Sequence, residues 1–215
     1  MNKDYLLIDL DGTVTDSRVG VTKSVQYSLT HFGIHVADAD ELIGFIGPPL
    51  RDSYQKYYGI IGENAEKAIE KYREYYSDRG IYENELYEGM DKLLRAQFEK
   101  GRKIILATSK AAVYAKKILE HFEIDKYFCF AAGAEFDGTR SRKDEVIRYA
   151  LDSVGITSMD RAIMVGDKRH DIIGAKTVGM ESIGVLYGYG DFDELSAAGA
   201  DYIAGSVEEL SVMLG

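Results

Sequence analysis

Hydrophobic positions along this chain alternate between short continuous runs and a helical repeat, most regularly after residue 89. The continuous runs, which predict buried strands, are 102–107, 127–132, 162–165, 182–186 and 202–204. The segments with helical spacing are 111–122, 142–154, 171–178, 191–198 and 207–214. One more apolar run, at 5–8, precedes them all. Alternating strands and helices of this kind predict an α/β fold, with a parallel sheet covered by helices on both faces.

Residues 17–86 interrupt the alternation because they contain little strand pattern. Apolar residues repeat at helical spacing over 21–32 and again over 65–76. The two prolines of the chain, Pro48 and Pro49, predict a stiff loop over 44–50 instead of a helix. We therefore expect an α-helical cap over 17–86, inserted into a core formed by 1–16 and 87–215.

Composition limits the class of protein. Apolar residues make up 46% of the chain, which is enough for a substantial core. The formal charge of −10 argues against a nucleic-acid partner, because binding to a phosphate backbone requires a basic face. No segment is apolar enough to span a membrane and no signal peptide is apparent, so we expect a cytoplasmic protein. A monomer or small homo-oligomer is expected, although the sequence does not distinguish between them. The single cysteine, Cys129, lies in a predicted strand and is expected to be buried and inert.

A pair of carboxylates follows the first predicted strand, in Asp9-Leu10-Asp11-Gly12-Thr13. Strand side chains repeat every second residue, so Asp9 and Asp11 can point to the same side. Such a pair at a strand end can hold a divalent cation, or divide nucleophilic and acid/base roles. These five residues are equally compatible with an ordinary polar turn.

Two further segments place polar side chains between a predicted strand and a predicted helix. Thr108 and Ser109 follow the strand at 102–107, where they can either bind an anion or cap the next helix. Ser141 and Asp144 have the spacing of a capping box, which would start a helix there. Lys143 then lies in the first helical turn, where a cation opposes the helix dipole. A nearby phosphate would explain a lysine at this position, and an ordinary exposed lysine is the alternative.

The last such segment is Gly166-Asp167-Lys168-Arg169-His170-Asp171, directly after the strand at 162–165. Asp167 and Asp171 can share a face if a helix begins between them. Carboxylates at this position suit Mg²⁺, which prefers oxygen ligands. We expect His170 to lie in a loop and not to bind the metal, because Mg²⁺ disfavours imidazole.

Taken in order, these motifs resemble those of the haloacid dehalogenase superfamily. The shared series is Asp-x-Asp-Gly-Thr, a strand-terminal Thr/Ser, a Lys and Gly-Asp-x-x-x-Asp, and it extends over nearly the whole chain. The resemblance implies a Rossmann-like parallel sheet with a helical cap after the first motif. An acid at the position of Asp11 is typical of the phosphatases and phosphomutases of this superfamily, and is missing from its dehalogenases and phosphonate hydrolases.

The resemblance also implies roles for the residues. Asp9 would be the nucleophile that forms an aspartyl-phosphate, and Asp11 the general acid and base. Thr108 would hydrogen-bond a phosphoryl oxygen with Ser109 nearby, and Lys143 would neutralise the phosphoryl group and Asp9.

The same resemblance implies a Mg²⁺ cofactor. The ion would be held by Asp9, the carbonyl of Asp11, and Asp167, with Asp171 supporting it directly or through water. Positive charge beside a phosphate and several carboxylates is the main need of phosphoryl transfer, so this assignment is physically consistent.

The substrate is then a small phosphorylated metabolite. The runs 136–140 and 184–190 look closest to members of the phosphoglycolate phosphatase-like group that are described as 5′-nucleotidases, which favours nucleoside 5′-monophosphates. Phosphoglycolate or another small phosphomonoester is the alternative, followed by a phosphomutase of the β-phosphoglucomutase type and a non-catalytic binding module. Arg51 is a candidate for gripping the distal part of the substrate, although a surface role fits it as well. The many tyrosines of residues 17–86 are expected to pack within the cap.

Overall fold

The computed structural model describes residue 1 and residues 3–215. It divides into two compact units, of which the first comprises Met1–Thr15 and Leu86–Gly215 and the second comprises Asp16–Glu85. Two short strands, β2 (Thr15–Asp16) and β3 (Glu85–Leu86), pair where the chain passes between the units. No helix in the described part of the chain combines the length and apolar character needed to cross a membrane.

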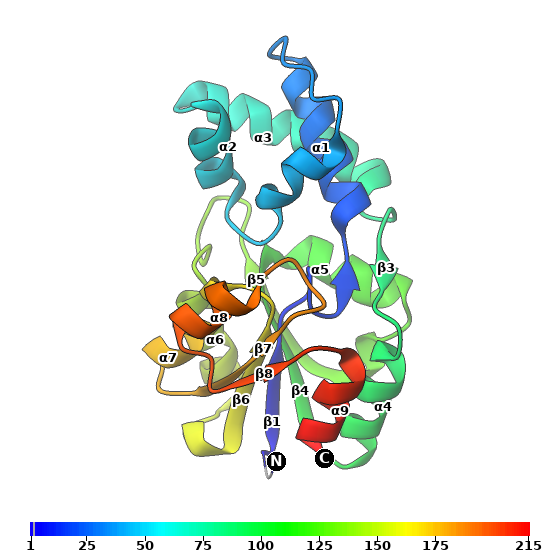
Figure 1. Ribbon diagram of the computed structural model, residues 1–215, viewed down its shortest axis with the longest axis vertical. Helices are drawn as coiled ribbons and strands as arrows, with labels where there is room; N and C mark the ends of the chain where they lie inside the picture. The colour runs from blue at the N-terminus through cyan, green and yellow to red at the C-terminus, as the bar shows by residue number, and fades with distance from the viewer. Residues whose placement is uncertain (2) are drawn as a thin grey trace. The chain divides into compact units, whose positions relative to one another are not determined.

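The first unit is built on a six-stranded sheet whose strands all run parallel (Figure 1). The strands are β1 (Tyr5–Ile8), β4 (Lys103–Ala111), β5 (Phe128–Ala134), β6 (Ala162–Gly166), β7 (Glu181–Val185) and β8 (Tyr202–Ala204), in the order β5-β4-β1-β6-β7-β8. At the centre, Ile8 pairs with Leu106 on one side and Val165 on the other. The chain thus reverses its direction across the sheet beside β1, which is where open α/β sheets bind ligands.

Helices cover both faces of this sheet. They are α4 (Met90–Glu99), α5 (Ala112–His121), α6 (Lys143–Val154), α7 (Arg169–Thr177), α8 (Phe192–Ala198) and α9 (Val207–Leu214). Right-handed crossovers place α6, α7 and α8 on one face and α4, α5 and α9 on the other (Figure 1). The predicted α/β class is therefore confirmed, although α4 is a helix that we did not predict as a separate element.

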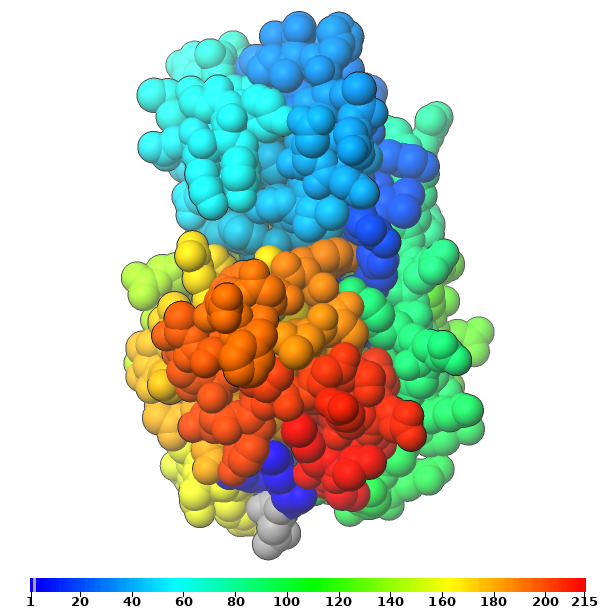
Figure 2. Space-filling view, viewed as in Figure 1, coloured from blue at the N-terminus to red at the C-terminus, as the bar shows by residue number. Residues whose placement is uncertain are grey.

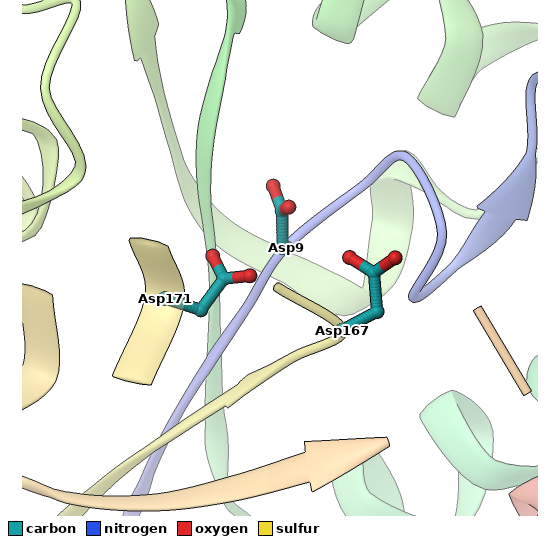
Figure 3. Close-up of side chains that lie close together, drawn as sticks. All are labelled: Asp9, Asp167 and Asp171. Carbon is teal, nitrogen blue, oxygen red and sulfur yellow. The ribbon is translucent and has the colours of Figure 1, made fainter. Parts of the chain in front are cut away.

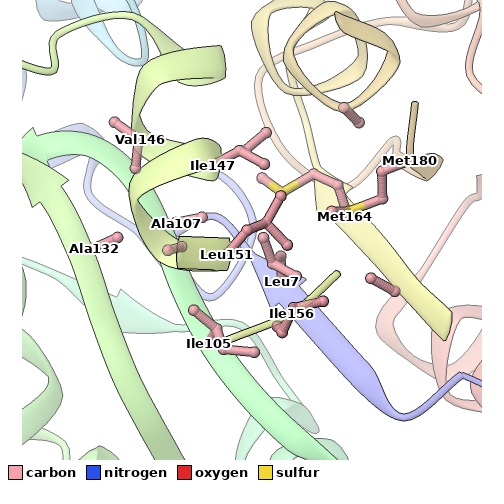
Figure 4. Close-up of a cluster of buried hydrophobic side chains, with 13 residues drawn as sticks. Leu7, Ile105, Ala107, Ala132, Val146, Ile147, Leu151, Ile156, Met164 and Met180 are labelled. Carbon is pink, nitrogen blue, oxygen red and sulfur yellow. The ribbon is translucent and has the colours of Figure 1, made fainter. Parts of the chain in front are cut away.

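The core beneath α6 shows how the apolar pattern becomes packing (Figure 4). Val146, Ile147 and Leu151 of α6 are buried against Leu7 of β1 and Ile105 of β4. These strands are apolar on both faces because helices cover both sides of a parallel sheet. The same packing fixes the carboxyl ends of β1, β4 and β6, which carry the polar motifs.

The two ends of the chain meet in this unit. The Met1 ammonium donates to the Met213 carbonyl oxygen at 3.0 Å. The C-terminal helices α8 (orange) and α9 (red) are both visible on the surface shown in Figure 2.

Cys129 is exposed on the edge strand β5, so the prediction that it is buried was wrong. Partial burial of its sulfur nevertheless raises the pKa of the thiol, which disfavours the reactive thiolate.

The second unit is helical, with α1 (Arg18–Thr30), α2 (Leu50–Tyr58), α3 (Glu63–Tyr75) and the short 3₁₀ and π segments Ala39–Phe45 and Tyr76–Gly80. Tyr54, Tyr72 and Tyr76 are buried, and the last two stack with ring centroids 5.3 Å apart, so the predicted packing role of these tyrosines is confirmed.

The predicted stiff loop over 44–50 is only partly correct. Its first two residues end the 3₁₀ segment and Leu50 begins α2 directly after Pro49, so only 46–49 lie outside these helical segments.

Candidate active site

Asp9 and Asp11 leave the carboxyl end of β1 and are both largely buried. The Asp9 amide donates to the Val165 carbonyl, which ties this position to β6. Gly12 has a φ of +82°, and a Cβ at this position would lie 2.1 Å from Asp167 Oδ2. The turn therefore requires glycine both for its backbone conformation and for the close approach of Asp167.

Three carboxylates converge on one point beside this turn. One ligand oxygen each from Asp9, Asp167 and Asp171 lies within 4.8 Å of the others, and the three carboxylates point to the same side in Figure 3. Asp171 reaches the cluster from the first turn of α7, because Gly166 leaves room for it; a Cβ there would lie 2.4 Å from Asp171 Oδ2. A helix does begin between Asp167 and Asp171, and the two carboxylates lie in the same cluster, as predicted.

Charge repulsion and burial act on this cluster together. Burial and the charges of Asp171 and Asp9 raise the pKa of Asp167 well above its ordinary value. Burial raises the pKa of Asp9 to about 6, against the opposing charge of Lys143. Asp167 Oδ1 is buried and has no hydrogen-bond partner among the described residues. An all-oxygen donor set with an unpaired buried oxygen fits a hard divalent cation.

Lys143 supplies a buried positive charge at the cluster. Its ammonium nitrogen lies 2.8 Å from Asp9 Oδ1 and 2.7 Å from Asp171 Oδ1, and it donates to the Ala107 carbonyl at 3.0 Å. Burial alone would lower the pKa of Lys143, but the charges of Asp171 and Asp9 outweigh it and raise that pKa. The side chain therefore remains an ammonium ion.

The start of α6 differs by one residue from the prediction. The helix begins at Lys143 after Arg142, and the Glu145 carboxylate accepts from the Arg142 amide at 3.3 Å. The predicted box between Ser141 and Asp144 was therefore wrong, because Asp144 pairs with the Arg142 guanidinium instead. Lys143 still occupies the first helical position, and it is buried beside the carboxylates of Asp9 and Asp171, so the alternative of an exposed surface lysine was wrong.

Thr108 and Ser109 lie near the end of β4, and neither caps a helix. The residue before α5 is Ala111, and no side chain caps that helix. The buried Thr108 hydroxyl oxygen instead accepts from the Lys110 amide at 3.2 Å, which leaves its O–H able to donate. The helix-capping alternative is thus wrong for both residues.

Two residues at the site were missed in the sequence. The Tyr189 amide donates to Asp167 Oδ2 at 2.8 Å, and a Cβ at Gly188 would lie 2.2 Å from the Gly12 carbonyl oxygen. The Lys110 ammonium contacts both carboxylate oxygens of Asp11. For Tyr189, the only signal in the sequence was the glycine on each side of it, which allows close packing. For Lys110, the signal was its position directly after Thr108 and Ser109, which were already candidate site residues.

Two other predicted residues lie outside this cluster. His170 is in the first turn of α7, so its expected placement in a loop was wrong; burial lowers the pKa of its imidazole. Arg51 lies in the second unit, on the exposed surface of α2, and its guanidinium is 2.5 Å from the Glu66 carboxylate of α3.

Fold and site define the class of protein. The sequence profile of the haloacid dehalogenase-like hydrolases matches residues 6–185, and the chain belongs to this family. It is 44% identical over 192 residues to a 5′-nucleotidase of Pseudomonas aeruginosa, covering 89% of this chain and 86% of that protein. It is 37% identical over 212 residues to the tyrosine-protein kinase PtkA of Mycobacterium tuberculosis, covering 98% of this chain and 72% of that one.

A solved structure described as a predicted phosphatase from Clostridium acetobutylicum superimposes with a TM-score of 0.96. It is 46% identical and covers 100% of this chain and 99% of its own. Phosphoglycolate phosphatases are more distant relatives. The predicted membership is therefore confirmed, and the chain is a phosphatase of the haloacid dehalogenase-like family.

Proposed function

We propose that this protein is a Mg²⁺-dependent phosphomonoesterase that acts on nucleoside 5′-monophosphates through an aspartyl-phosphate at Asp9. The observation that carries the proposal is the buried Asp9 carboxylate, paired with Lys143 and converging with Asp167 and Asp171. The relative named 5′-nucleotidase supports the choice of substrate class. Small metabolites such as phosphoglycolate are the alternative substrates.

The reaction has two steps. An Asp9 carboxylate oxygen attacks phosphorus, the bond from phosphorus to the ester oxygen breaks, and protonated Asp11 gives its proton to the departing oxygen. A water molecule then attacks phosphorus and transfers a proton to Asp11, the bond from Asp9 to phosphorus breaks, and inorganic phosphate leaves. Covalent catalysis of this kind replaces one difficult step by two easier ones.

Lys143 and Thr108 serve the phosphoryl group in this scheme. Lys143 orients the attacking Asp9 carboxylate and keeps a fixed positive charge beside the three phosphoryl oxygens. Thr108 is held at the strand end by its contact with the Lys110 amide, so its O–H can donate to one of those oxygens. Ser109 is next to it and is proposed as a second binding residue.

Asp9, Asp167 and the Asp11 carbonyl would hold Mg²⁺, with Asp171 in support. The ion would neutralise charge on the phosphoryl group and on the carboxylates. The donor set fits, because the cluster contains only carboxylate oxygens and leaves the buried Asp167 Oδ1 without a hydrogen-bond partner among the residues described.

A phosphate-release screen tests the proposal. Nucleoside 5′-monophosphates, phosphoglycolate and sugar phosphates are compared in Mg²⁺ and in EDTA. We expect phosphate release in Mg²⁺ only, fastest with the nucleotides. A preference for phosphoglycolate would replace the substrate class and keep the chemistry. An isomerised sugar phosphate without phosphate release would indicate a phosphomutase, and no turnover of any ester would favour a binding module.

Asp167→Asn should weaken Mg²⁺ binding about 10- to 100-fold, because it removes one of the converging charges at the cation site. The measurement is the rise in melting temperature of the protein during a Mg²⁺ titration, which does not depend on activity. Asp160→Asn is the matched control, since Asp160 is an exposed aspartate outside the cluster. If the Mg²⁺ titration of Asp167→Asn matched that of the wild type, Asp167 would not be a ligand of the cation.

Arg51→Ala should raise KM about 10-fold and leave kcat nearly unchanged, if Arg51 contacts only the non-reacting part of the substrate. Glu66→Gln is the matched variant, because it removes the ion-pair partner of Arg51 and keeps the arginine. Its KM should stay at or below the wild-type value. Unchanged steady-state constants in Arg51→Ala would assign Arg51 to the surface of the helical unit.

A further inference from the structure

A second lysine, whose side chain is largely but not fully buried, lies beside the carboxylate that is proposed to transfer protons. The Lys110 ammonium is 2.6 Å from one oxygen of Asp11 and 2.9 Å from the other. The side chains are only 7% and 11% exposed, so this pair is far less solvated than the surface ion pairs of the chain. None of the side-chain roles proposed above falls on Lys110.

An irregularity in the sheet places Lys110 there. Ala107 of β4 pairs with Ala132 of β5, but the next pair is Ala111 with Ala134, so β4 contains extra residues between them. Bulges of this kind redirect side chains next to active sites. Gly133 makes the bulge possible, because a Cβ at that position would lie 2.7 Å from the Lys110 carbonyl oxygen.

Lys143 and Lys110 contact different carboxylates. Lys143 contacts Asp9 and Asp171, whereas Lys110 contacts Asp11 through both oxygens. The terminal torsion of an aspartate is broad, so an unrestrained carboxylate samples many orientations. Charge-assisted hydrogen bonds to both oxygens restrict that rotation.

We propose that Lys110 is a positioning residue, which holds the Asp11 carboxylate in the orientation that proton transfer to the leaving oxygen requires. This inference rests on the proposed function, because it assumes that Asp11 is the general acid. Misplacement of a reacting group by about 1 Å can cost about 100-fold in rate. Loss of Lys110 should therefore slow the step in which Asp11 gives its proton and leave substrate binding intact.

Lys110→Met tests this with two substrates that differ in their need for a proton. The departing oxygen of a nucleoside monophosphate must be protonated, whereas p-nitrophenolate leaves as a stable anion. Rapid-quench measurement of the first turnover should show nucleoside release slowed about 30- to 100-fold. The p-nitrophenolate burst should slow less than about threefold, and KM for each substrate should change less than about threefold.

Asp11→Asn provides the comparison. It should show the same substrate dependence, and the variant with both substitutions should be no slower than Asp11→Asn alone, because Lys110 acts through Asp11. Lys110→Arg should recover part of the lost rate. Lys3→Met, which removes another largely buried ion-paired lysine at Glu181, should leave both rates unchanged.

Three results would overturn the inference. They are equal slowing of both substrates, a raised KM for both, and losses that multiply in the double variant. Melting temperatures identify a variant that does not fold, in which case Lys110→Gln, which keeps a polar end, replaces Lys110→Met. Full turnover by Asp11→Asn would refute the proposed acid role itself, whereas a slow Asp11→Asn beside a fast Lys110→Met refutes only the role of Lys110.

Discussion

Asp9→Asn is expected to reduce turnover by at least about 10⁴-fold, because an amide cannot replace the carboxylate as the attacking nucleophile. Substrate should still bind, since Lys143 and Thr108 remain in place. No phosphorylated protein should form. Intact-protein mass spectrometry after rapid acid quench measures this directly, with a poor substrate or low temperature used to accumulate the intermediate in the wild type.

The substitution should not destabilise the fold. Asparagine has nearly the same shape as aspartate, and it removes one negative charge from a buried cluster whose burial already raises the pKa of Asp9. In EDTA the melting temperature of Asp9→Asn should therefore equal or exceed that of the wild type. A folded Asp9→Asn protein that turns over normally would refute the covalent mechanism.

Lys143→Met is expected to have the second-largest effect, and on two properties at once. Its ammonium compensates Asp9 and Asp171 inside the protein, so its removal leaves buried carboxylates without that cation. Breaking a buried ion pair from one side costs about 3–5 kcal/mol in the free energy of unfolding. Urea unfolding in EDTA measures this loss, and phosphate release should fall by at least about 10²-fold.

Mg²⁺ should restore part of the lost stability, because a bound cation supplies positive charge to the same carboxylates. Lys3→Met is again the matched control, as its ammonium lies 2.5 Å from Glu181 away from the cluster. Wild-type stability of Lys143→Met in EDTA would mean that the carboxylates do not depend on the lysine for charge compensation. Stability that does not respond to Mg²⁺ would contradict the proposed cation site.

The sheet and most of its helices were predictable from local sequence pattern. The periodic segment 142–154, for example, is the helix Lys143–Val154. The helix Leu50–Tyr58 was missed because two prolines precede a largely polar segment. Pro49 in fact stands just before the first helical residue, where the missing amide hydrogen carries little cost. Cys129 was misjudged because the sequence does not reveal which strand lies at the edge of a sheet.

The acidic part of the site was predictable for a topological reason. The carboxyl ends of neighbouring parallel strands lie at one edge of the sheet, so residues that follow β1 and β6 meet there. The contacts of Lys110 and Tyr189 could not be predicted in this way. The first depends on a bulge opposite Gly133, and the second depends on a backbone amide, which any residue type except proline could provide.

The glycines around Asp167 and Asp171 have a practical consequence for protein engineering. Side chains at Gly12, Gly166 or Gly188 would bring a Cβ within 2.4 Å of a carboxylate or carbonyl oxygen of the site, and one at Gly190 would lie 1.9 Å from the Asp167 carbonyl oxygen. A library that randomised these positions would consist mostly of inactive variants. Diversification aimed at new phosphate esters should keep the four glycines fixed and vary exposed positions of the helical unit, beginning with Arg51, the proposed contact to the non-reacting part of the substrate.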